Sequence, residues 1–204
     1  MEKTMLFAII LSVIGILVLL TFYRISKKTQ ERKMLQAIYS TDFDTFFKVA
    51  DSKFTRYVFP KFNLEYLKLN VHILKNDEPS IDESFEKMFK FKMNTPQKED
   101  IYMKAFNYYV GMEKKEKTTQ LIEVIETFDN EELKNEARII YDIFVLKKSN
   151  YIDDMIEALP KQDINTKGVN EYLISVQYKN LNDNKNAKKY EALSKKHLNN
   201  KKSK

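Results

Sequence analysis

Side chains that could carry out chemistry are sparse in this sequence. It has two histidines, His72 and His197, no cysteine, and three glycines too far apart to form a phosphate-binding loop. Metal sites and nucleophilic catalysts need several such groups at defined spacings. The sequence therefore predicts no catalytic residue, no metal ligand and no cofactor, and we expect the protein not to be an enzyme. His72 lies in an apolar helical stretch, where we expect a partly buried, hydrogen-bonded ring, whereas His197 is expected to be exposed.

Two acidic pairs offer the remaining possibility of acid–base chemistry or of a cation site. They are Asp42 with Asp44 and Asp153 with Asp154. Each pair falls at the start of an expected helix, where carboxylates cap free backbone N–H groups and interact favourably with the helix dipole. We therefore interpret both pairs as helix caps.

The elements that would position any binding site are helix pairs that recur about every 35 residues. First helices are predicted to begin near Phe62, Gln97, Glu131 and Lys167, and second helices near Ser80, Lys114, Asn150 and Asp183. The sequence is 43% hydrophobic and has only three glycines and four prolines, which argues against a β-sandwich or barrel. We expect an all-α chain with an α-solenoid of about four to five helix-turn-helix pairs.

An uncharged apolar run occupies residues 5–23, ahead of the predicted pairs. As a helix it would be roughly 28 Å long, close to the thickness of the bilayer interior. We predict a single transmembrane helix at 5–23 rather than a cleaved signal peptide, because the run is long and no small-residue cleavage site follows it.

A basic segment, 24–33, follows the apolar run and is expected to lie next to the membrane and to contact anionic lipid. Its basic residues are Arg24, Lys27, Lys28, Arg32 and Lys33. Positive charge favours the cytoplasmic side, so the predicted location is the cell membrane, with the helical domain in the cytoplasm. An outward-facing domain with the same binding role is the alternative.

The rest of the chain divides into three parts. Residues 34–61 are interpreted as a degenerate first helix pair and linker, residues 62–198 as the repeats, and residues 199–204 as a disordered basic tail. The end 185–204 holds eight lysines against one glutamate, a net charge of +7 (8 − 1). It could bind nucleic acid or anionic lipid with the repeats as a spacer, although nucleic acid is not the expected partner.

Residues 172–193 carry the most specific pattern in the sequence. Tyr178 lies in a first helix, Asn182-Asp183 form a turn, a small Ala187 follows at the helix crossing, and Tyr190 comes after it. This segment resembles a tetratricopeptide repeat. The resemblance implies a concave groove, lined largely by first helices, that holds a protein or peptide partner. The turn glycine of that family is absent, and asparagine, which tolerates the left-handed conformation, occupies or adjoins its place at 76, 150 and 182.

The function expected from these patterns is that of a membrane-anchored adaptor or scaffold that binds a protein or peptide partner at the cytoplasmic face. Three asparagines on first helices could hydrogen-bond the backbone of a bound peptide: Asn70, Asn107 and Asn180. They are the candidate groove residues.

Overall fold

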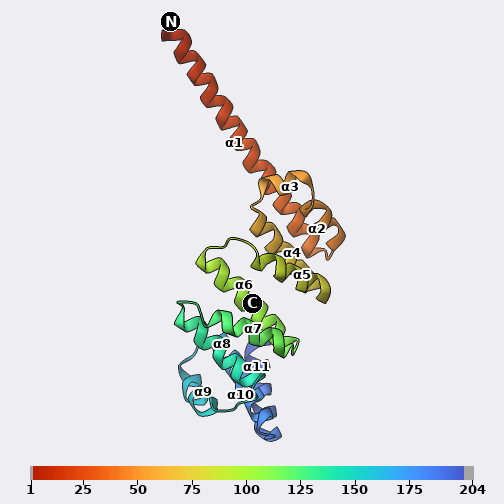
Figure 1. The fold of residues 1–204 in the computed structure, drawn as a ribbon, viewed down its shortest axis with the longest axis vertical. Coiled ribbons are helices and arrows are strands. Elements are labelled where there is room, and N and C mark those ends of the chain that lie inside the picture. Colours follow the sequence, from red (N-terminus) through yellow and green to blue (C-terminus); the bar gives the residue numbers. More distant parts are fainter. Residues whose placement is uncertain (1, 200–204) are drawn as a thin grey trace. The chain divides into compact units, whose positions relative to one another are not determined.

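The computed structural model describes the backbone of residues 2–199 and the side chains of residues 13–199. Over residues 2–199 it contains eleven α-helices, one short 3₁₀ helix and no strand (Figure 1). The all-α prediction is therefore confirmed. The chain forms two compact units, Met1–Lys92 (unit 1) and Met93–Lys204 (unit 2), and each is considered by itself below.

The predicted transmembrane helix at 5–23 is wrong for the part of the chain that the structure describes. Among those residues no helix is both long enough and apolar enough to cross a bilayer. The side chains of 5–12 lie outside the described residues, and a span needs about 20 consecutive apolar residues. The described run from Val13 to Tyr23 is followed directly by Arg24, Lys27 and Lys28 within one continuous helix. Tyr23, the last residue of this run, donates its hydroxyl to the Val58 carbonyl at 2.8 Å.

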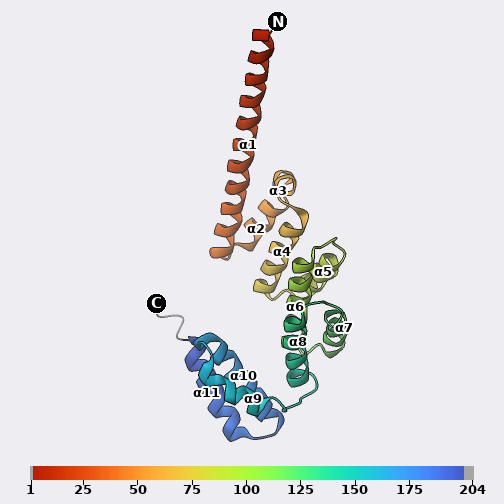
Figure 2. The same cartoon turned by 90° about the vertical axis from the view of Figure 1, so that its left-hand side faces the viewer.

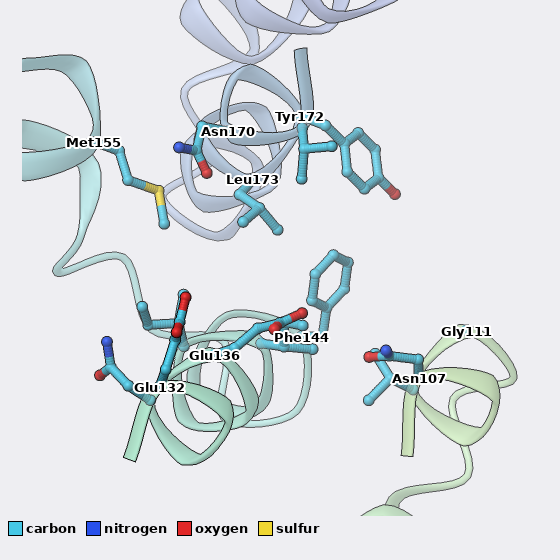
Figure 3. Close-up of a pocket in the computed structure, with 14 residues that line it drawn as sticks. Asn107, Gly111, Glu132, Glu136, Phe144, Met155, Asn170, Tyr172 and Leu173 are labelled. Atoms are coloured by element: carbon cyan, nitrogen blue, oxygen red, sulfur yellow. The ribbon is translucent and has the colours of Figure 1, made fainter. Parts of the chain in front are cut away.

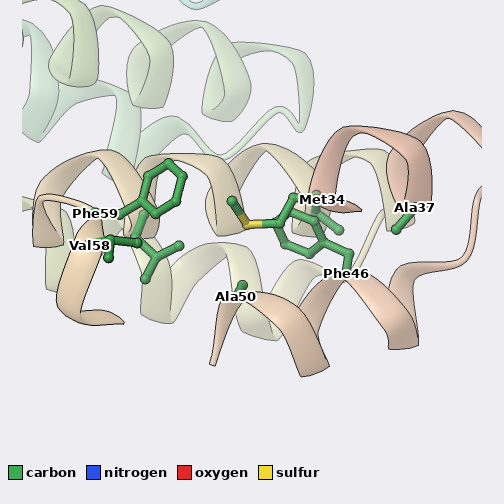
Figure 4. Close-up of a cluster of buried hydrophobic side chains, with 8 residues drawn as sticks. Met34, Ala37, Phe46, Ala50, Val58 and Phe59 are labelled. Carbon is green, nitrogen blue, oxygen red and sulfur yellow. The ribbon is translucent and has the colours of Figure 1, made fainter. Parts of the chain in front are cut away.

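Unit 1 contains five helices: α1 (Glu2–Tyr39), α2 (Phe43–Ala50), α3 (Lys53–Val58), α4 (Lys61–Lys75) and α5 (Glu78–Phe89). The end of α1 packs against α2 and α3, α2 also contacts α4, and α4 pairs with α5. Residues 34–61 thus hold the end of α1 together with α2 and α3. These three segments and α4 share one core, which Figure 4 shows. It consists of Met34, Ala37, Phe46, Ala50, Val58, Phe59, Leu64 and Val71. Burying each large side chain contributes about 1.5–3 kcal/mol.

Unit 2 contains three helix pairs. These are α6 (Thr95–Gly111) with α7 (Lys115–Ile125), α8 (Glu131–Phe144) with α9 (Ile152–Ala158), and α10 (Ile164–Asn180) with α11 (Asn184–Asn199); the 3₁₀ helix η1 (Leu159–Lys161) follows α9. The first helices contact one another in sequence, α6 with α8 and α8 with α10. The most extensive packing is between α10 and α11, which lie side by side in both Figure 1 and Figure 2.

The helix starts agree closely with the predicted period. First helices begin at Lys61, Thr95, Glu131 and Ile164, which are 34, 36 and 33 residues apart, each within three residues of its predicted start. The second helices α5, α7, α9 and α11 begin within two residues of theirs. Packed neighbouring helices at this spacing are compatible with a helical repeat.

Turns between helices adopt the left-handed conformation without using glycine. Asn76 and Asn182, two of the three predicted positions, have φ of 54° and 61°. Asn150 does not have a positive φ; Lys147 takes this conformation before α9, with φ 56°, and Glu113 does so between α6 and α7, with φ 55°. Lysine and glutamate have a higher conformational energy than asparagine in the left-handed region. The packing of the helices that these turns join therefore imposes this conformation.

The basic C-terminal end is a packed helix over its described length. The buried residues of α11 are Ala187, Tyr190 and Ser194, and α11 packs against α10. A Cβ at Gly168 of α10 would lie 2.9 Å from the side chain of Leu198, so a larger residue there would require Leu198 to move. The tail predicted to be disordered spans residues 199–204. Asn199 is the last residue of α11, and residues 200–204 lie outside the described residues.

Candidate functional site

The three first helices of unit 2 enclose one cavity of about 580 Å3. Three of its lining residues come from α6, six from α8, one from α9 and four from α10, and Figure 3 shows the close-up. The lining residues are Asn107, Val110, Gly111, Glu132, Asn135, Glu136, Ile139, Ile140, Phe144, Met155, Val169, Asn170, Tyr172 and Leu173. Ligand pockets of proteins commonly have volumes of about 300–1,000 Å3.

Polar bonds outside the cavity hold these helices in place. Asn130 caps α8 by accepting from the Leu133 N–H at 3.1 Å, and its amide donates to Glu99 of α6 at 3.1 Å. Asn180 of α10 donates to the Ile143 carbonyl at 2.9 Å and to the Lys148 carbonyl at 3.1 Å. The relative positions of α6, α8 and α10 are therefore fixed by specific bonds as well as by apolar packing.

Apolar side chains form much of the cavity wall. The rings of Phe144 and Tyr172 lie 6.2 Å apart with a 34° tilt, and both face the space shown in Figure 3. Tyr172 is 44% exposed and Val169 is half exposed, while Leu173 is partly buried. Partly exposed aromatic and aliphatic groups in a concave surface gain free energy when an apolar side chain covers them.

Carboxylates supply the only formal charges among the side chains that line the cavity. Glu132 and Glu136 are four residues apart on α8, so both lie on the same side of that helix, and both are exposed. No Lys, Arg or His lines the cavity, and no ion pair between residues 13 and 199 engages either glutamate. The charged side chains of this lining therefore favour a cationic group.

Three asparagines add neutral hydrogen-bonding groups, and only one of them was predicted. Asn107 of α6 lines the cavity as a candidate groove residue, whereas Asn135 of α8 and Asn170 of α10 were missed. Asn135 and Asn170 are 35 residues apart, one repeat period (170 − 135), which is a signal that the sequence did contain. An amide offers both a donor and an acceptor to a peptide backbone.

The other two candidate groove residues lie elsewhere. Asn70 is a half-buried residue of α4 in unit 1 and does not line this cavity. Asn180 also lies outside the lining, and its amide donates to the carbonyls of Ile143 in α8 and of Lys148 after it. The cavity thus brings together Asn107 and residues that were not predicted.

The basic segment predicted to contact lipid forms part of α1. Arg24, Lys28 and Arg32 are exposed and recur every fourth residue, so they share one side of the helix. Lys27 is partly buried, with its ammonium 5.5 Å from the centre of the Phe59 ring. Lys33 is exposed and lines a small cavity with Asp42 and Thr45. Contact with anionic lipid stays a prediction.

Other groups considered for chemistry have structural roles. Asp42 caps α2 by accepting from the Thr45 N–H, and this bonding lowers the pKa of Asp42. Asp153 and Asp154 lie in the first turn of α9, as expected, but neither caps it: the N-cap is Tyr151, and no side chain makes a capping hydrogen bond there. Within the described residues no group of three or more His, Cys, Asp or Glu side chains could hold a metal ion.

No protein-family model, curated protein or solved structure matches this chain. The cavity and its lining are therefore the basis for a functional argument.

His72 gives unit 1 a pH dependence. Its ring is partly buried, as expected, and lies 4.8 Å from that of Phe47, but its buried Nδ1 has no hydrogen-bond partner among the described residues. Burial lowers the pKa of His72, although Asp77 opposes this shift. A histidine whose pKa is lower when folded stabilises the fold fully above its unfolded pKa of about 6.5 and loses that contribution as the pH falls.

We expect the free energy of unfolding to fall as the pH decreases below about 6.5, and His72→Phe to reduce this slope. Urea midpoints measured for both proteins across this range would test the expectation. Parallel slopes for the two proteins would show that His72 does not contribute.

Proposed function

We propose that this chain is a non-enzymatic binding protein that holds an extended segment of a protein partner in the α6/α8/α10 cavity of unit 2. The observation that carries the proposal is the composition of the cavity: two carboxylates without an internal partner beside exposed aromatic and aliphatic groups. The bound segment would place a Lys or Arg near Glu132 and Glu136, and a large apolar side chain against Phe144 and Tyr172.

The arrangement of helices supports the same proposal. A cavity lined mainly by first helices, at a repeat spacing near 35 residues, is what a tetratricopeptide-like array would have. Asn107, Asn135 and Asn170 would hydrogen-bond the backbone of the segment, as amides can both donate and accept. We place the chain in this class of repeats as part of the proposal.

The basic end of the chain is a weaker candidate for the binding site. One side of α11 is buried against α10, and Glu191 pairs with Lys179 at 3.0 Å and Lys195 at 2.7 Å. These two lysines lower the pKa of Glu191 to about 2. Part of the positive charge at this end is therefore already compensated, which favours the cavity of unit 2.

Panning a library of random displayed peptides against the full chain tests the proposal. We expect enriched peptides to combine a Lys or Arg with a neighbouring large apolar residue. Glu132→Gln/Glu136→Gln should weaken binding of a synthetic enriched peptide by about tenfold, the loss of one charge-assisted contact.

The matched control is Glu116→Gln/Glu123→Gln, which removes the same charge from two exposed residues of α7. It should leave the affinity unchanged. Enrichment of acidic peptides, or equal binding by both double variants, would refute the assignment.

A further inference from the structure

A second cavity, in unit 1, has the opposite charge. It has a volume of about 510 Å3 and lies where α3, α4 and α5 meet. Its lining consists of Lys53, Arg56, Tyr57, Lys61, Leu64, Glu65, Lys87 and Phe91. Four of these eight residues are cationic and one is acidic.

The carboxylates near this cavity are already paired. Glu65 accepts from Lys87 at 2.8 Å and from Lys68 at 3.4 Å, and Lys68 also pairs with Asp51. The two carboxylates and two ammonium groups of this network cancel in charge (−2 + 2 = 0). Glu65 is the one acidic residue in the lining of this cavity, and it is already paired.

Lys53, Arg56 and Lys61 therefore carry an excess charge of +3. None of them forms an ion pair within residues 13–199, and all three are exposed. The fold holds them on one cavity: Ser52 accepts from the Thr55 N–H at 3.2 Å and fixes the start of α3, and Pro60 precedes Lys61 at the start of α4. Like charges held close together repel one another, and a bound anion relieves that repulsion.

The remaining walls would suit an organic anion. Tyr57 is 84% exposed, and Phe91 is fixed by an edge-to-face contact with Phe62 at 6.1 Å. The planar guanidinium of Arg56 matches two oxygens of a phosphate group at once, and the lysines act as point charges. A phosphate ester carries up to two negative charges near neutral pH, which suits the excess charge.

We propose that this cavity of unit 1 binds the phosphate group of a phosphate ester, through Lys53, Arg56 and Lys61. The ester is either a soluble phosphorylated compound or a lipid headgroup, which share this chemistry. The site belongs to a different unit from the peptide cavity and does not depend on the function proposed for it.

The test uses the full chain in two experiments, one with soluble ligands and one with lipid vesicles. Titration calorimetry with inorganic pyrophosphate and glycerol 3-phosphate examines soluble ligands, and flotation with phosphatidylcholine vesicles, with or without phosphatidate, examines a lipid source. We expect binding in at least one arm, and Lys53→Gln/Arg56→Gln/Lys61→Gln should weaken it by about tenfold or more. Arg56→Lys keeps the charge but cannot bond two phosphate oxygens at once, so it should weaken phosphate binding by a smaller factor. This single variant tests the proposal if the triple variant does not fold.

Two matched triple variants make the assignment specific. Lys185→Gln/Lys188→Gln/Lys196→Gln removes three charges from α11 and should bind the soluble ligands like the parent chain. Lys48→Gln/Lys115→Gln/Lys161→Gln removes three exposed lysines that lie outside α1, α11 and both cavities, and should retain binding in both arms. Absence of binding in both arms, or an equal loss in either control, would overturn the proposal. Glu132→Gln/Glu136→Gln should bind phosphate normally, which separates this result from that of the peptide cavity.

Discussion

Replacing Phe106 by alanine should lower the free energy of unfolding of unit 2 by about 3–5 kcal/mol, the usual cost of removing a buried aromatic ring. Phe106 is 0% exposed and lies on α6 among four other buried residues of that helix. The substitution removes the packing of the ring and leaves a cavity that the surrounding helices can only partly close.

Urea unfolding followed by circular dichroism measures the loss, and hydrogen exchange locates it. Since helices in a repeat array depend mainly on their neighbours, we expect protection to fall in α6–α8 and to persist in α2 and α4 of unit 1. Tyr39→Ala, at a residue 85% exposed, is the control and should change stability by less than about 0.5 kcal/mol. An equal loss of protection in both units would contradict this expectation.

The order of helices could be predicted because each one carries an apolar stripe with helical spacing. In α5, for example, Ile81, Phe85 and Met88 recur at the spacing of one helix face, and all three are fully buried. Helix boundaries were harder. A second helix was predicted to begin near Ser80, but α5 begins at Glu78, where Asp77 caps it and accepts from the Ser80 N–H at 3.3 Å.

Turn conformations were predictable only where the residue itself prefers them. Asn76 and Asn182 tolerate a positive φ, and both have one. Glu113 and Lys147 have no such preference, and their conformations follow from how α6 meets α7 and how α8 meets α9. Local sequence does not contain that information, because it depends on contacts between helices.

The candidate cavity was only partly predictable for a related reason. Asn107 was named because it lies on a first helix, but Asn70 and Asn180 were named by the same rule and do not line the cavity. Which side of a helix faces a groove depends on how neighbouring helices cross, and the spacing of polar residues does not specify that crossing. The membrane prediction relied on a single apolar run, and among the described residues no helix is both long enough and apolar enough to cross a bilayer.

His197 shows how packing can reverse an interpretation based on sequence. It lies among lysines and was expected to be exposed, but that expectation is wrong. Its Nδ1 is 2.6 Å from Oε2 of Glu171, and the Glu171 side chain is only 1% exposed. An ionised carboxylate at that depth needs a donor, and Nδ1–H donates to it. The pair joins the end of α11 to α10, close to Gly168.

His197→Ala should therefore destabilise unit 2 by about 3 kcal/mol, because it leaves the Glu171 carboxylate buried without a partner. Urea unfolding at neutral pH measures this loss. Glu171→Leu/His197→Leu should recover most of it, since replacing both members of a buried pair by apolar groups is often nearly neutral. His197→Asn, whose amide nitrogen takes nearly the position of Nδ1, should cost much less than alanine because it keeps a donor. If alanine and asparagine proved equally tolerated, the bond would contribute nothing to the docking of α11, and packing at Ala187, Tyr190 and Ser194 alone would hold that helix in place.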